Sequence, residues 1–198
     1  MGQIFPRQFG LLFGLALVAA AVLLAGAVVG WRVAIAPALG EPVEQPVPFS
    51  HKHHVGDDGL DCRYCHATAD SSAYAGMPSS STCMNCHSQL FTDAPLLEPV
   101  RASWRNGTPL HWNRIYRLPD FAFFDHSIHV RAGVGCEHCH GDLSKMPLTW
   151  QASSLDMQWC LACHREARRI LASAHAGAAH PVRVRSAREL SDCSTCHR

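Results

Sequence analysis

The sequence predicts one small domain of short helices and loops with little β-structure, placed behind a single N-terminal membrane-spanning helix. Two observations predict this architecture. Residues 10–31 form an uncharged apolar run of about 22 residues, enough to cross a bilayer whose hydrocarbon core is about 30 Å thick. Residues 49–198 contain five copies of the pattern Cys-x-x-Cys-His, which leaves too little chain between copies to build an ordinary apolar core.

Three segments are predicted from composition. Residues 1–36 form a membrane anchor, which we expect to be retained because Ala34-Ile35-Ala36 is followed by Pro37, a poor residue after a signal-peptide cut. Residues 37–48, PALGEPVEQPVP, hold four prolines and are predicted to form an extended, semi-rigid stalk. Residues 49–198 are predicted to be the functional domain. The 17 basic and 16 acidic residues nearly balance, which gives no indication of nucleic-acid binding.

The five Cys-x-x-Cys-His motifs carry the chemistry of the domain. In such a motif two thiols bind the vinyl groups of one haem, and the histidine that follows becomes the proximal ligand of the iron. Zinc sites and disulfides also use paired cysteines, but neither needs that histidine. With 14 histidines in 198 residues, five such matches by chance have a probability on the order of one in a million. The sequence therefore predicts five covalently bound haem c groups. The cysteines are Cys62, Cys65, Cys83, Cys86, Cys136, Cys139, Cys160, Cys163, Cys193 and Cys196, and the proximal ligands are His66, His87, His140, His164 and His197.

Candidate distal ligands lie in an internal repeat. FSHKHHV, with His51 and His54, precedes Cys62, and FDHSIHV, with His126 and His129, precedes Cys136. Residues 49–87 and 124–164 are therefore predicted to be duplicated two-haem modules, with the fifth haem in residues 165–198. Histidines at i and i+3 project from one side of a helical turn, so each can serve one of two neighbouring haems. His53 and His138 are expected not to be ligands.

The FxHxxH segments followed by CxxCH resemble the small multihaem cytochromes of the class III type. That resemblance implies that the first histidine of a pair binds the haem just after it and the second binds another haem. Longer strings resemble the pentahaem c-type cytochrome subunit of bacterial alternative complex III, a quinol-oxidising respiratory assembly. These strings are CRYCH, TCMNCHSQLFTDAPLLEPVR, YRLPDFAFFDHSIHVRAGVGCEHCHG, MPLTWQASSLDMQWCLACHR and DCSTCHR.

The resemblance implies an electron-transfer subunit that is not an enzyme by itself. A partner subunit would oxidise quinol, and this chain would pass the electrons to a monohaem cytochrome, a soluble carrier or a terminal oxidase. Because haem c is attached outside the cytoplasm, the single-pass chain would place its haem domain on the periplasmic face of the bacterial inner membrane. The alternative is a free-standing membrane-anchored quinol dehydrogenase that feeds a reductase. A catalytic multihaem reductase fits less well, because no CxxCK motif is present.

The distal ligand of the fifth haem stays open at this point. Met146 is our first candidate and Met157 our second, and His180 is the best histidine, ahead of His175 and His111. A thioether ligand would raise the reduction potential of that haem relative to the bis-histidine haems, which would make it the downhill end of the relay.

Overall fold

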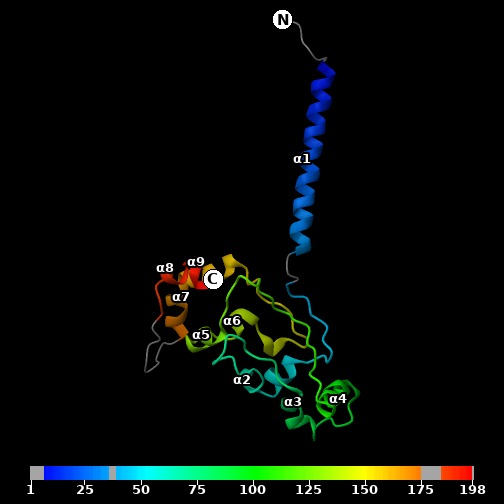
Figure 1. Ribbon diagram of the computed structural model, residues 1–198, viewed down its shortest axis with the longest axis vertical. Helices are drawn as coiled ribbons and strands as arrows, with labels where there is room; N and C mark the ends of the chain where they lie inside the picture. Colours follow the sequence, from blue (N-terminus) through cyan, green and yellow to red (C-terminus); the bar gives the residue numbers. More distant parts are fainter. Residues whose placement is uncertain (1–6, 36–38, 175–183, 198) are drawn as a thin grey trace. The chain divides into compact units, whose positions relative to one another are not determined.

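The computed structural model describes residues 7–35, 39–174 and 184–197, and the chain divides into two compact units, Met1–Ala38 and Leu39–Arg198 (Figure 1). The first unit consists of helix α1, Arg7–Ile35. Its segment Gln8–Val33 has a mean hydropathy of 2.7 and, within the described chain, is the one helix long and apolar enough to span a membrane. This helix could therefore serve as an anchor.

The second unit is built from short helices joined by long loops, as the sequence predicts. Its helices are η1 (Lys52–Asp57), α2 (Cys62–Cys65), α3 (Ser80–His87), η2 (Pro95–Leu97), α4 (Glu98–Asn106), α5 (His126–Arg131), α6 (Glu137–His140), η3 (Leu143–Lys145), α7 (Met157–Ala174), α8 (Ala187–Leu190) and α9 (Cys193–Cys196). The only β-pairing in the described residues is two isolated bridges, Leu39 with Gln151 and Pro42 with Trp150. The prediction of little β-structure is confirmed.

The described part of the segment predicted to be a stalk, residues 39–48, belongs to the second unit and packs against its loops. Beyond the two bridges, Val43 N–H donates to the carbonyl of Thr149 at 3.2 Å, and Gln45 exchanges hydrogen bonds with Asn113. Val47 is only 4% exposed. Three prolines, Pro42, Pro46 and Pro48, keep residues 39–48 out of a helix, and the backbone groups that therefore lack helical partners pair with neighbouring loops.

Several of the short helices begin at side-chain caps, and two of these caps lie just before a Cys-x-x-Cys-His motif. Asp61 accepts a hydrogen bond from Arg63 N–H at 2.8 Å at the start of α2, and Asp192 does the same for Ser194 at 2.9 Å at the start of α9. Asp125 caps α5 through Ser127. These caps satisfy amide groups that have no partner inside the helix, so even a single turn is held in shape.

An apolar core is nearly absent from the second unit. Buried apolar side chains in the described chain are limited to Val47, Val100, Met146, Ala167 and Leu171. Large apolar side chains instead stay open to solvent, among them Tyr64, Tyr74, Leu90, Phe91, Trp104, Phe121 and Phe123. So many large apolar side chains exposed to water are unfavourable, which indicates that a further apolar group covers them.

Candidate haem sites

The five Cys-x-x-Cys-His motifs lie on helical turns and are here called sites 1 to 5 in chain order. Site 1 is Cys62–His66 on α2, site 2 Cys83–His87 on α3, site 3 Cys136–His140 at α6, site 4 Cys160–His164 on α7 and site 5 Cys193–His197 on α9. In sites 1, 3 and 5 the histidine N–H donates to the carbonyl of the first cysteine at 2.9–3.0 Å. That helical bond puts the two thiols and the imidazole of each site on one turn.

Nearly all the predicted ligand histidines share one hydrogen-bond arrangement. Their Nδ1 atoms bond to a backbone carbonyl, or in one case to a hydroxyl, at 2.7–3.2 Å. The pairs are His51 with Thr149, His54 with Ser50, His66 with Gly76, His87 with Leu90, His126 with Ala73, His129 with Asp125, His164 with Leu190 and His197 with Phe121. A carbonyl accepts only from a protonated nitrogen, so Nδ1 is protonated in the seven rings that bond to a carbonyl, and in the neutral form of such a ring the lone pair is on Nε2. This arrangement is typical of histidines that bind a metal through Nε2.

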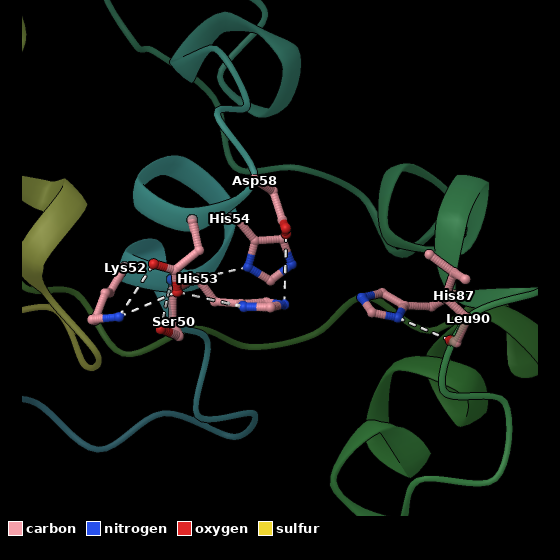
Figure 2. Close-up of polar contacts among 8 residues, drawn as sticks. Ser50, Lys52, His53, His54, Asp58, His87 and Leu90 are labelled. Carbon is pink, nitrogen blue, oxygen red and sulfur yellow. Dashed lines mark hydrogen bonds and ion pairs between the residues drawn. The ribbon is translucent and has the colours of Figure 1, made fainter.

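Three of these imidazoles face a proximal histidine from another part of the chain. The ring centres of His54 and His87 are 6.2 Å apart, those of His126 and His140 6.5 Å, and those of His129 and His164 6.1 Å. Figure 2 shows the first pair: the two rings face each other, and each turns its Nδ1 away toward its carbonyl acceptor.

The spacing of these pairs matches two ligands of one metal ion. An imidazole nitrogen binds a transition metal at about 2 Å and lies about 1 Å from its ring centre, so two rings on opposite sides of a metal have centres about 6 Å apart. The separations of the three pairs, 6.1–6.5 Å, are therefore compatible with one iron between the two rings of each pair.

His51 lies in a partly buried environment with other imidazoles nearby, among them His66. Burial is the main cause that lowers the pKa of His51 to about 4, and the nearby His66 imidazole is the second. Burial and the neighbouring His126 and His66 likewise lower the pKa of His140 to about 4. Both rings are thus neutral at neutral pH and have a lone pair available for a metal.

The two FxHxxH segments repeat the same side-chain contacts. Phe49 stacks on His54 at 4.4 Å and meets His51 edge-on at 4.9 Å; Phe124 stacks on His129 at 4.6 Å and meets His126 edge-on at 4.7 Å. The backbones differ, because the first segment forms a π-helical turn and the second an α-helical one. One phenylalanine thus fixes the orientation of both histidines in each segment.

His53 and His138 lack the arrangement of the other histidines. Their side chains are 52% and 50% exposed, and they lie beside carboxylates, His53 near Asp57 and Asp58 and His138 near Glu137.

The candidates for the fifth distal ligand differ in burial. Met146 is 2% exposed, its carbonyl accepts from Lys52 N–H at 2.9 Å, and its methyl group lies close to Gly141, directly after site 3. Met157 begins α7 and is 59% exposed, and His111 is exposed in a loop. His175 and His180 lie outside the described residues.

The residues present fit a covalently bound haem at each motif. All ten cysteines are free of disulfides. Each motif offers two thiols on one turn for the covalent bonds and an adjacent imidazole for the iron. Exposed aromatic side chains such as Tyr64 and Phe91 could cover the flat apolar ring of the haem.

Some residues that position the ligands give little sequence signal. Thr149 bonds to His51 across 98 residues at 2.8 Å, and Tyr116 packs edge-on against His140 with ring centres 4.6 Å apart. Both come from loops, so no periodicity marks them. Phe49 and Phe124 could have been found, because they occupy equivalent places in the repeat.

Comparison with known proteins gives two matches. Residues 47–99 and 122–198, together more than half of the chain, match the family described as cytochrome c7 and related cytochrome c. A stretch of 98 residues is 37% identical to the menaquinone reductase multihaem cytochrome c subunit of Nitratidesulfovibrio vulgaris (strain Hildenborough) and covers 49% of this chain and 46% of that protein. The chain thus spans about half the length of the curated relative that it matches. It belongs to the family of cytochrome c7 and related c-type cytochromes, and it is a multihaem electron-transfer protein.

Proposed function

We propose that this chain is the electron-transfer subunit of a membrane-bound, quinol-oxidising respiratory complex and that it carries five covalently bound haem c groups. The observation that carries the proposal is the set of opposed imidazoles, 6.1–6.5 Å apart, beside sites 2, 3 and 4. Two strong-field axial ligands close an iron to substrates and leave it suited to accepting and releasing single electrons.

Each group of residues has a proposed role. The ten cysteines hold the haems as thioethers, and the histidine that ends each motif is the proximal ligand. His51, His54, His126 and His129 are the distal ligands of sites 1, 2, 3 and 4, in that order. The Nδ1 hydrogen bonds fix each ring and increase its electron donation through Nε2.

For site 5 we propose Met157 as the distal ligand in preference to Met146. A sulfur that binds iron has to lie on a surface that the haem covers. The open side chain of Met157 meets that requirement, whereas Met146 is enclosed by protein atoms beside site 3, where His126 already faces His140. His180 remains the best histidine candidate.

The proposed partner and the proposed direction of electron flow follow from the resemblance to alternative complex III. In the membrane partner a quinol loses two electrons and two protons and becomes a quinone. This chain accepts the electrons one at a time and passes them to a monohaem cytochrome or a terminal oxidase. Helix α1 would anchor it in the bacterial inner membrane, with residues 39–198 on the periplasmic face.

A second candidate function is supported by the relative in Nitratidesulfovibrio, which is named as part of a menaquinone reductase. The same subunit would then deliver electrons to the quinone site instead of removing them. A third candidate, the free-standing quinol dehydrogenase, would need this single chain to bind quinol and release protons by itself.

Activity of the native assembly tests the proposal. The complex, purified from membranes in mild detergent through a tag on this chain, is expected to reduce an oxidised soluble cytochrome c with menadiol as the quinol. The isolated chain is expected to show no such turnover. Turnover by the isolated chain at the rate of the complex would favour the free-standing dehydrogenase. A complex that reduces menadione with a reduced cytochrome, but does not oxidise menadiol, would favour the reductase.

A further inference from the structure

We propose that the five haem sites form a single row in the order 2, 1, 3, 4, 5, so that sites 2 and 5 are its ends. This inference rests on the proposed binding of one haem at each motif. The order differs from that of the sequence, and four sets of contacts carry it.

Sites 2 and 1 are joined by η1 and by a direct contact between the motifs. His54 faces His87 of site 2, and His51, three residues earlier, is the proposed distal ligand of site 1. Asn85, inside the second motif, donates its side-chain N–H to the hydroxyl of Tyr64, inside the first, at 3.1 Å.

Sites 1 and 3 are joined by the chain that follows site 1. Residues 70–73 lie directly after the first motif and accept hydrogen bonds from α5. Ala73 bonds to the Nδ1 of His126 at 2.8 Å, and Asp70 accepts from the Nε of Arg131 at 2.9 Å. His126 is the residue that faces His140 of site 3.

Sites 3 and 4 share α5. His126 faces His140 of site 3 with ring centres 6.5 Å apart, and His129, one turn later, faces His164 of site 4 at 6.1 Å. One short helix therefore holds two neighbouring sites at a fixed separation, as η1 does for sites 1 and 2.

Sites 4 and 5 meet through α8. The Nδ1 of His164 donates to the carbonyl of Leu190 at 2.9 Å, three residues before Cys193. Thr195, inside the fifth motif, donates its hydroxyl to the carbonyl of Glu189 at 2.9 Å. Site 5 also contacts the segment that leads into α5, since Phe123 N–H donates to the carbonyl of Cys196 at 2.8 Å.

The ribbon shows the same succession along the second unit. Helices α3 and α2 lie toward one end, α5 and α6 in the middle, and α7, α8 and α9 at the other end (Figure 1). A row has two terminal sites, so electrons would enter at one of sites 2 and 5 and leave at the other. The middle of the row is site 3.

Distances from a spin label to the irons test the order. In the haem-loaded protein the native cysteines are thioethers, so a cysteine introduced at Gln89, beside site 2, can be labelled alone with a nitroxide. Pulsed electron paramagnetic resonance (EPR) then gives the label-to-iron distances, and alanine in place of both cysteines of one motif identifies which distance belongs to which site. The proposal predicts that removing site 1 deletes the second-shortest distance, site 3 the third and site 5 the longest.

A second label and a second measurement guard against variants that fail to fold. A nitroxide at Arg188→Cys on α8 is expected to give the reverse ranking. Iron positions from anomalous scattering in crystals of the intact protein need no haem deletion and are expected to show site 1 between sites 2 and 3. Either measurement overturns the proposal if site 2 lies between sites 1 and 3. A protein with fewer than five haems would contradict the proposed function itself, whereas five haems in another order would contradict this inference alone.

Discussion

We expect each of three single substitutions to leave one of the five haem irons five-coordinate instead of six-coordinate. The substitutions are His54→Ala, His126→Ala and His129→Ala. Each of these histidine rings lies about 6 Å from the histidine of a Cys-x-x-Cys-His motif and bonds through Nδ1 to a carbonyl, so its Nε2 would be the atom that binds the iron in the proposed site. Without the ring, the iron becomes high-spin and open to small molecules. EPR of the oxidised protein should show a new high-spin ferric signal, and carbon monoxide should bind one more haem per protein after reduction.

Two other histidines provide matched controls. His53→Ala removes an imidazole next to His54 in sequence, and His138→Ala removes one inside the third motif; both side chains are about half exposed and lie beside carboxylates. Neither substitution is expected to change the carbon monoxide stoichiometry. A spectrum of His54→Ala, His126→Ala or His129→Ala that keeps every haem low-spin would remove the histidine in question from the ligand set.

Leucine in place of Met157 is expected to abolish the thioether-to-ferric-iron band near the red end of the oxidised spectrum. It should also lower the potential of one haem by on the order of 100 mV, because a sulfur ligand favours the ferrous state relative to nitrogen or water. The absorption spectrum of the oxidised protein measures the first effect, and a redox titration measures the second.

Met146→Leu is the matched control. Leucine conserves the volume of this 2% exposed side chain, so the core around Gly141 should be kept and the band should remain. Met146→Ala should instead reduce stability by about 2–5 kcal/mol, through the cavity that it leaves. A band that disappears in Met146→Leu and persists in Met157→Leu would reverse the assignment. A wild-type protein without the band would point to a histidine, and His180→Ala should then produce the high-spin haem.

The site chemistry could be predicted from the sequence because it is local. A Cys-x-x-Cys-His motif needs only one helical turn, and the structure forms such turns around Cys62, Cys136 and Cys193. The repeat around His51 and His126 likewise depends on a spacing of three residues, and the structure gives both copies the same aromatic contacts. The scarcity of apolar core also followed from the density of motifs along the chain.

The arrangement of the motifs in space could not be predicted, because it depends on contacts between distant loops. The bond from His126 to Ala73 spans 53 residues, and the bond from His51 to Thr149 spans 98. Neither acceptor belongs to a recognisable pattern. The same holds for the proline-rich segment, whose composition indicates an extended chain but not the loops at Asn113 and Thr149 against which it lies. The burial of Met146 also depends on a neighbour, Gly141, whose position is set by the turn after site 3.

The mass of the intact protein under denaturing conditions tests the central claim most directly. Noncovalent groups and metal ions dissociate under those conditions, whereas thioether-bound haem stays attached. The account predicts a single species heavier than the 21.7 kDa apo chain by five haem masses, and lighter by one haem mass in each variant that lacks one cysteine pair. A wild-type protein at its apo mass, or with fewer than five haems attached and zinc in the preparation, would contradict it.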